Sequence, residues 1–174
     1  MSLLTIFTDS GFGIRLSGGK LDFTCGVKLD GEFLITLERD GVPVKVVRAH
    51  NIITSAGQGL IGDMLRDVDE YDTGLTYCAI GTTTSEPLTS QTALAAEVLR
   101  REIQSDHRIG SVVTWTTRFF AAETPYTILE VGMFGHNTAN GTANTGIMFD
   151  RATIDFNNGS ALYDIAFEYR LTLS

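Results

Sequence analysis

The chain has 174 residues, a length typical of one domain. Apolar residues make up 43% and charged residues 20%, which excludes a disordered or fibrous protein. With 13 basic and 21 acidic residues the formal charge is −8, so we expect no nucleic acid and no anionic membrane among its partners. No apolar run reaches the roughly 18 residues that span a bilayer, and the first residues lack the pattern of a secretory signal.

Residues 1–32 are rich in glycine and threonine without a strong period, which predicts an N-terminal arm or short strands. The next segment, 33–48, has the pattern of a hairpin, because apolar and more polar positions alternate on both sides of Asp40-Gly41. We expect residues 33–174 to form the folded domain.

Residues 54–66 form the best helix candidate. Their apolar positions make one stripe, composed of Leu60, Ile61, Met64 and Leu65. Thr54 or Ser55 can cap the first turn. Three glycines weaken the helix, so we expect it to form only by docking, with glycine allowing close approach to a sheet. The prediction is one short helix near residues 55–66.

The second half of the chain has the alternation of β-strands. The predicted strands occupy residues 111–121, 127–134, 147–156 and 161–173, and the last is the longest. Residues 90–103 suit a helix by propensity but lie among strands, so both structures stay open. Short strands with tight turns and one docked helix predict an all-β fold, a β-sandwich of jelly-roll-like or immunoglobulin-like type.

No motif in the sequence predicts an enzyme or a cofactor. The glycine-rich segment at 11–20 misses the spacing of a phosphate loop and of a dinucleotide fingerprint, and a GxSxG motif is missing. One weak metal candidate is a run of four carboxylates, Asp67, Asp69, Glu70 and Asp72. Its spacing differs from that of an EF-hand, so a solvated loop is the preferred interpretation and a calcium-assisted enzyme the weaker alternative.

The two cysteines, Cys25 and Cys78, lie far apart and lack metal-ligand spacing. We expect reduced, buried thiols, with a disulfide as the alternative. The histidines His50, His107 and His136 show no metal spacing either, and we expect them in turns or on the surface.

Charged residues within predicted strands suggest ion pairs. Glu130 shares a strand face with apolar neighbours, so we expect it to be partly buried and paired, with Arg151 as the partner. A second group, composed of Glu97, Arg100, Arg101 and Glu102, adjoins an aliphatic segment. We expect this group to lie on a solvated face, with charge pairs at a subunit contact as the alternative.

Short motifs follow one another along the domain in a distinctive order. They are NIITSAG at 51–57, AIGTTTSEP at 79–87, TALAAEVLR at 92–100, ILEVGMF at 128–134, MFDRAT at 148–153 and the closing strand. This order resembles a group of tailed-bacteriophage virion structural proteins over about residues 33–174. Ser55 and Thr83 depart from the residues common in that group, at loop positions.

The resemblance implies a non-enzymatic structural component of the virion. It implies a place at the tail, neck or collar, as a fibre adaptor or accessory, or alternatively a capsid decoration protein. Expected partners are other virion structural proteins and further copies of the chain, arranged as a trimer or ring.

A receptor- or carbohydrate-binding module is the competing function. Its interaction surface would combine aromatic side chains with a polar loop, and the candidates are Trp115, Tyr71, Tyr126, His136, Asn137 and Asn140. The competing interpretation of Trp115 places it in the core of a strand.

Overall fold

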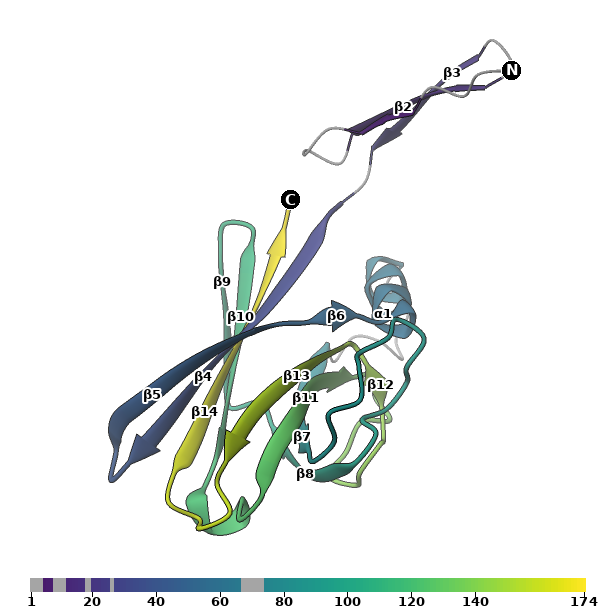
Figure 1. Cartoon of the computed structure of the whole chain (residues 1–174). Helices are drawn as coiled ribbons and strands as arrows, with labels where there is room; N and C mark the ends of the chain where they lie inside the picture. Colours follow the sequence, from purple (N-terminus) through teal and green to yellow (C-terminus); the bar gives the residue numbers. More distant parts are fainter. Residues whose placement is uncertain (1–4, 8–11, 18–19, 26, 67–73) are drawn as a thin grey trace.

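The computed structural model describes the backbone of residues 5–7, 12–17, 20–25, 27–66 and 74–174, and side chains from residue 27 onward within these ranges. Two antiparallel sheets face each other and a short helix covers one end (Figure 1). The predicted all-β sandwich with one short helix is therefore confirmed.

The first sheet has five strands in the order β5-β4-β14-β10-β9. Their bounds are β4 Leu29–Arg39, β5 Val42–His50, β9 Ser105–Ile109, β10 Val112–Phe119 and β14 Asp164–Leu173. The predicted hairpin is the pair β4–β5, whose turn places Asp40 and Gly41 at positive φ. The closing strand β14 inserts between β4 and β10, so it joins the two ends of the chain's domain in one sheet.

The second sheet has the order β6-β13-β11-β7-β8, and β12 pairs with β11. Its strands are β6 Ile52–Ile53, β7 Leu75–Gly81, β8 Glu97–Glu102, β11 Thr127–Gly135, β12 Ile147–Met148 and β13 Asp150–Asn157. A 3₁₀ turn, η2 at Ala121–Glu123, links β10 to β11. Chain segments β5 and β6 follow directly on one another, so this part of the chain passes from one sheet to the other.

The core fills the space between the two sheets. Alternate residues of β14 are buried, as its period predicts. From the other sheet, Val131 and Met133 of β11 and Ile154 of β13 pack in the same cluster. Aromatic rings meet at its centre, where Phe33 lies 4.8 Å from Tyr169 between ring centroids.

The helix α1, Ser55–Leu65, begins at the predicted cap. The Thr54 hydroxyl accepts a hydrogen bond from the Gly57 N–H at 2.9 Å and donates to the Met148 carbonyl at 2.6 Å. A Cβ at Gly57 would collide with the Phe149 carbonyl. The helix thus docks by backbone contact at its first turn, and this glycine permits the contact.

Three predicted segments change in the structure, and the strand predicted at 147–156 divides at Phe149 into β12 and β13. The open segment 90–103 forms no helix: it runs as turn and coil and becomes the strand β8 at Glu97. Pairing with β7 decides this outcome, which local propensity left undecided. The predicted strand 161–173 begins at Asp164, because Ala161 adopts a positive φ in the preceding turn.

The N-terminal residues form a small sheet of their own. Its strands are β1 Thr5–Phe7, β2 Phe12–Ser17 and β3 Lys20–Cys25. Among the strands that the structure describes, they pair only with one another, in the order β1-β2-β3. Figure 1 shows this sheet beyond the end of the sandwich at which β4 begins.

Candidate interaction surface

The two outer faces of the sandwich differ. Segments 82–96 and 136–146 connect strands of the second sheet, and buried ion pairs hold both of them. The outer face of the five-stranded sheet carries polar side chains around a hollow of about 450 Å³. Charged residues hold the connecting segments of one face and line the hollow of the other.

Segment 82–96 is held by the predicted pair of Glu130 and Arg151. Both side chains are fully buried, and the Arg151 guanidinium lies 2.8 Å from the Glu130 carboxylate. Arg151 also donates to the Ser85 and Glu86 carbonyls, while Glu130 accepts from the backbone N–H of Ala96. Because these bonds saturate both charged groups, the segment is fixed against the sheet.

Segment 136–146 is held by a second buried pair, Glu97 with Arg100. Their contact is bidentate, at 2.6 and 2.8 Å, and both side chains are about 1% exposed. Arg100 also donates to the Thr145 carbonyl, and its guanidinium lies over the Phe134 ring at 4.5 Å. The expectation that these charges lie on a solvated face is therefore wrong for Glu97 and Arg100, because segment 136–146 folds over them.

The remaining members of that charged group lie near the surface. Arg101 forms an ion pair with Glu123 of η2, with both side chains partly exposed. Glu102 accepts a hydrogen bond from the Tyr77 hydroxyl at 2.9 Å. For Arg101 and Glu102 the expected solvated face is therefore confirmed.

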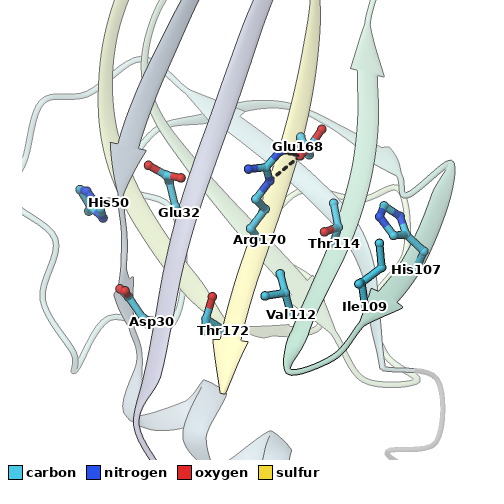
Figure 2. A pocket seen from close by; sticks show the side chains of 10 residues that line it. All are labelled: Asp30, Glu32, His50, His107, Ile109, Val112, Thr114, Glu168, Arg170 and Thr172. Atoms are coloured by element: carbon cyan, nitrogen blue, oxygen red, sulfur yellow. Dashed lines mark hydrogen bonds and ion pairs between the residues drawn. The ribbon is translucent and has the colours of Figure 1, made fainter. Parts of the chain in front are cut away.

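The pairing of the five strands brings together the side chains that line the hollow on the other outer face. One row of directly paired residues crosses all five strands: His50, Glu32, Arg170, Thr114 and His107. The neighbours of Glu32 and Arg170 along β4 and β14 face the core, so this row faces outward. Figure 2 shows the row together with Asp30, Thr172, Val112 and Ile109, which line one side.

Charges in the hollow are only partly matched. Arg170 contacts Glu168 at 2.5 Å, and Glu32 accepts from the exposed Arg48 at 3.0 Å (Figure 2 shows the first pair). The Asp30 carboxylate makes no hydrogen bond or ion pair within the described part of the chain, while its backbone pairs with Thr172. Three carboxylates and one guanidinium line the hollow, so it carries an excess of negative charge.

Thr114 sits at the floor of this hollow. It is only 6% exposed and lines the hollow through its side chain (Figure 2). Its hydroxyl makes no hydrogen bond to any residue that the structure describes. Because Thr114 lines the hollow, its hydroxyl is open to a hydrogen bond from water or from a ligand.

The structure brings some of the predicted interaction residues together. Trp115 is half-buried and stacks on Tyr169 at 5.6 Å, so it packs against the core as the competing interpretation holds. It lines a hollow of about 420 Å³ beside α1. His136 and Asn137 line an adjoining hollow of about 340 Å³, and Asp106 borders both.

The other candidates lie elsewhere. Tyr126 precedes the first residue of β11 and His136 follows its last, so about 30 Å of strand separates them. Asn140 is exposed but its carboxamide oxygen accepts from the Thr142 N–H at 2.8 Å, which serves the turn of segment 136–146. Tyr71 and the four carboxylates Asp67, Asp69, Glu70 and Asp72 lie outside the described residues.

Asp150 is a buried carboxyl that sequence analysis missed. It accepts hydrogen bonds from the Met133 N–H at 2.8 Å and from the Asn51 carboxamide, next to the Tyr169 hydroxyl. Burial raises the pKa of Asp150 to about 7, although bonds from Met133, Asn51 and Tyr169 partly oppose the rise. No local pattern distinguishes this aspartate, because its burial follows from β13 packing beneath Asn51.

The remaining titratable candidates are structural. Cys78 is a free thiol, fully buried, and burial raises its pKa well above the ordinary value, so it is not a reactive nucleophile. His50 and His107 are exposed, as expected. Within the described ranges, no three histidine, cysteine or acidic side chains gather as metal ligands.

The fold and its surfaces define a protein of the all-β sandwich class with an open polar hollow. In the described part of the chain, every helix is too short or too polar to cross a membrane. Comparison with models of known protein families, with curated proteins and with solved structures finds no match to this chain.

Proposed function

We propose that this protein is a non-enzymatic structural component of a tailed-phage virion, located on the particle surface at the tail, neck or collar. The proposal combines the ordered motifs of the sequence with one structural observation, the separate N-terminal sheet. Its three strands, of three, six and six residues, pair only with one another among the described strands. A three-stranded sheet depends on a hydrophobic face for its stability, and such a face is suited to dock on a neighbouring subunit.

The sandwich supports such a role by being rigid. Buried ion pairs hold both long segments of the second sheet, so little of the described surface has to be ordered on binding. A preformed surface loses less conformational entropy on assembly, which suits a particle component.

The edge strand β5 is better suited to side-chain contacts with a neighbouring subunit than to backbone pairing with another strand. Pro43 lacks an N–H, Lys45 adds a charge, and the register skips Val44 to form a bulge. These three features block the addition of another strand. Yet Val42, Val44 and Val46 are each more than half exposed. We therefore assign the β4–β5 hairpin to side-chain contacts with a neighbour.

Mass photometry of the purified chain tests assembly. We expect species at multiples of 18.9 kDa for the full chain and a monomer for a chain that begins at Val27, whose described core is complete without the arm. Equal masses for both, after allowance for the shorter chain, would contradict the role of the arm. Mass spectrometry of purified particles from the source bacterium tests the location, and absence from them would refute it.

Capsid decoration is the second placement of the same function. The quantity that separates the two is the copy number per particle. A decoration protein occurs in hundreds of copies, while a tail, neck or collar component occurs as one or a few rings.

A receptor- or carbohydrate-binding role is the second candidate function. It is favoured by the two adjoining hollows that bring Trp115 near His136 and Asn137. A glycan array tests it, with Asn137→Ala as the variant because Asn137 is exposed and lines the second hollow. Binding that is lost in Asn137→Ala with unchanged thermal unfolding would support this role.

A further inference from the structure

We propose that the outer hollow of the five-stranded sheet binds a lysine or arginine side chain on an extended segment of another protein. The proposal goes beyond a structural role in a virion and holds wherever the protein acts. Four observations carry it: the cross-strand row, the unmatched carboxylate, the unpartnered Thr114 hydroxyl and the exposed apolar rim.

The row places two acceptors, Glu32 and Thr114, at fixed positions on either side of Arg170. Direct pairing sets Glu32 beside Arg170, and Arg170 beside Thr114, across three adjacent strands. Side chains paired in this way lie about 5 Å apart. A basic segment that crosses the row therefore meets groups from several strands at once, on either side of Arg170.

The charge of the lining selects a cation. Asp30, Glu32 and Glu168 face a single guanidinium, that of Arg170 (Figure 2). Arg48 offsets part of this charge from outside the lining, but its side chain is 60% exposed and its pair with Glu32 is open to solvent. Asp30 keeps its full charge available for an incoming ammonium or guanidinium group.

Thr114 gives the hollow a specific hydrogen-bonding group in addition to its charge. Its residue is more than nine-tenths buried, faces the hollow and has an unpartnered hydroxyl. This hydroxyl can accept a hydrogen bond from a bound ammonium group. A general attraction to acidic surface needs no such group.

The rim favours a peptide over a free polyamine. Ile109 is 74% exposed. It belongs to the same cross-strand line as Asp30, and Thr172 and Val112 lie between the two. A polypeptide segment brings side chains and aliphatic stems that cover this apolar surface beside the bound charge.

Titration of the full chain with acetyl-Lys-Lys-Lys-amide, followed by ¹H–¹⁵N NMR at low salt, tests the proposal. We expect shift changes centred on Asp30, Thr114 and Arg170, and none with the matched glutamine peptide. Asp30→Asn and Thr114→Val should each weaken binding about tenfold, the size of one lost hydrogen bond to a charged group. Thr114→Ser keeps the hydroxyl and should bind like the wild type.

Asp155→Asn is the charge control, because Asp155 is exposed on β13 of the other sheet. It removes one negative charge and should leave the affinity unchanged. Equal weakening by Asp155→Asn and Asp30→Asn would overturn the site in favour of general charge attraction. Spermidine that binds as tightly as the peptide, or a hollow already filled by a second copy of the chain, would overturn the assignment to another protein. Circular dichroism confirms that each variant is folded.

Discussion

Glu130 and Arg151 form an ion pair 2.8 Å long in which both side chains are fully buried. Glu130 lies on β11 and Arg151 on the neighbouring strand β13, so the pair lies across the second sheet. It also gathers the backbone of segment 82–96, through bonds to Ser85, Glu86 and Ala96. This pair therefore decides the path of a segment that has no regular structure of its own.

Loss of one partner of this pair should be severe. We expect Arg151→Met to lower the free energy of unfolding by about 3–5 kcal/mol, because the Glu130 carboxylate is left buried without a cation. Denaturant unfolding measures the change. Arg66→Met is the matched control, since its pair with Asp63 is exposed, and it should change stability by less than about 1 kcal/mol. Similar effects for both variants would contradict the role of burial.

Arg100→Lys should loosen segment 136–146. Lysine cannot reproduce the bidentate contact with Glu97 together with the bond to Thr145. We expect faster hydrogen exchange at Thr142 and Asn144, whose N–H groups bond to Asn140 and Glu97. Segment 82–96 serves as the internal control. Faster exchange there to the same degree would show a global loss of stability instead.

Asp150 should make stability fall with rising pH. Its folded pKa of about 7 lies above the ordinary value of 3.8, so the folded state binds the proton more tightly. The contribution is therefore complete below about pH 4 and is lost as pH rises to 7, by about 4 kcal/mol in total. Asp150→Asn, which mimics the protonated acid, should flatten the difference between unfolding at pH 5 and at pH 8.

The pKa of Asp164 is shifted in the opposite direction, so Asp164 serves as the control for Asp150. The Ala121 N–H and the Arg118 guanidinium lower the pKa of Asp164, so its contribution is lost only as pH falls through the acid range. Asp164→Asn should leave the slope between pH 5 and pH 8 as in the wild type. If Asp150→Asn kept that slope too, Asp150 would not be its source.

Two glycines of α1 should respond with opposite sign to the same substitution. Gly57→Ala should destabilise the protein, because the new Cβ meets the Phe149 carbonyl. Gly59→Ala meets no atom within 4 Å and should stabilise it by up to about 1 kcal/mol through helix propensity. Thermal unfolding of both variants measures the difference. A stabilising Gly57→Ala would contradict the close docking of the helix.

Local patterns in the sequence predicted much of the fold. Alternation in the closing strand and around Asp40-Gly41 identified β14 and the β4–β5 hairpin, since a strand with one buried face requires a period of two. The sequence offered two residues, Thr54 and Ser55, as the N-cap of the helix, and Thr54 is the cap in the structure. The pair of Glu130 and Arg151 followed from placing a charge on an apolar strand face, where only a partner makes burial tolerable.

The candidate interaction surface required the tertiary structure. His50 and His107 stand at opposite ends of one row because β14 inserts between β4 and β10, which no local period encodes. Likewise, the burial of Arg100 and of Asp150 depends on segments that are distant in the sequence. Side-chain alternation is a local property of the chain, whereas strand order and register depend on which long-range pairings bury the most apolar surface together. The sequence by itself determined the strands and their faces, and only the assembled sheets decided which charges meet.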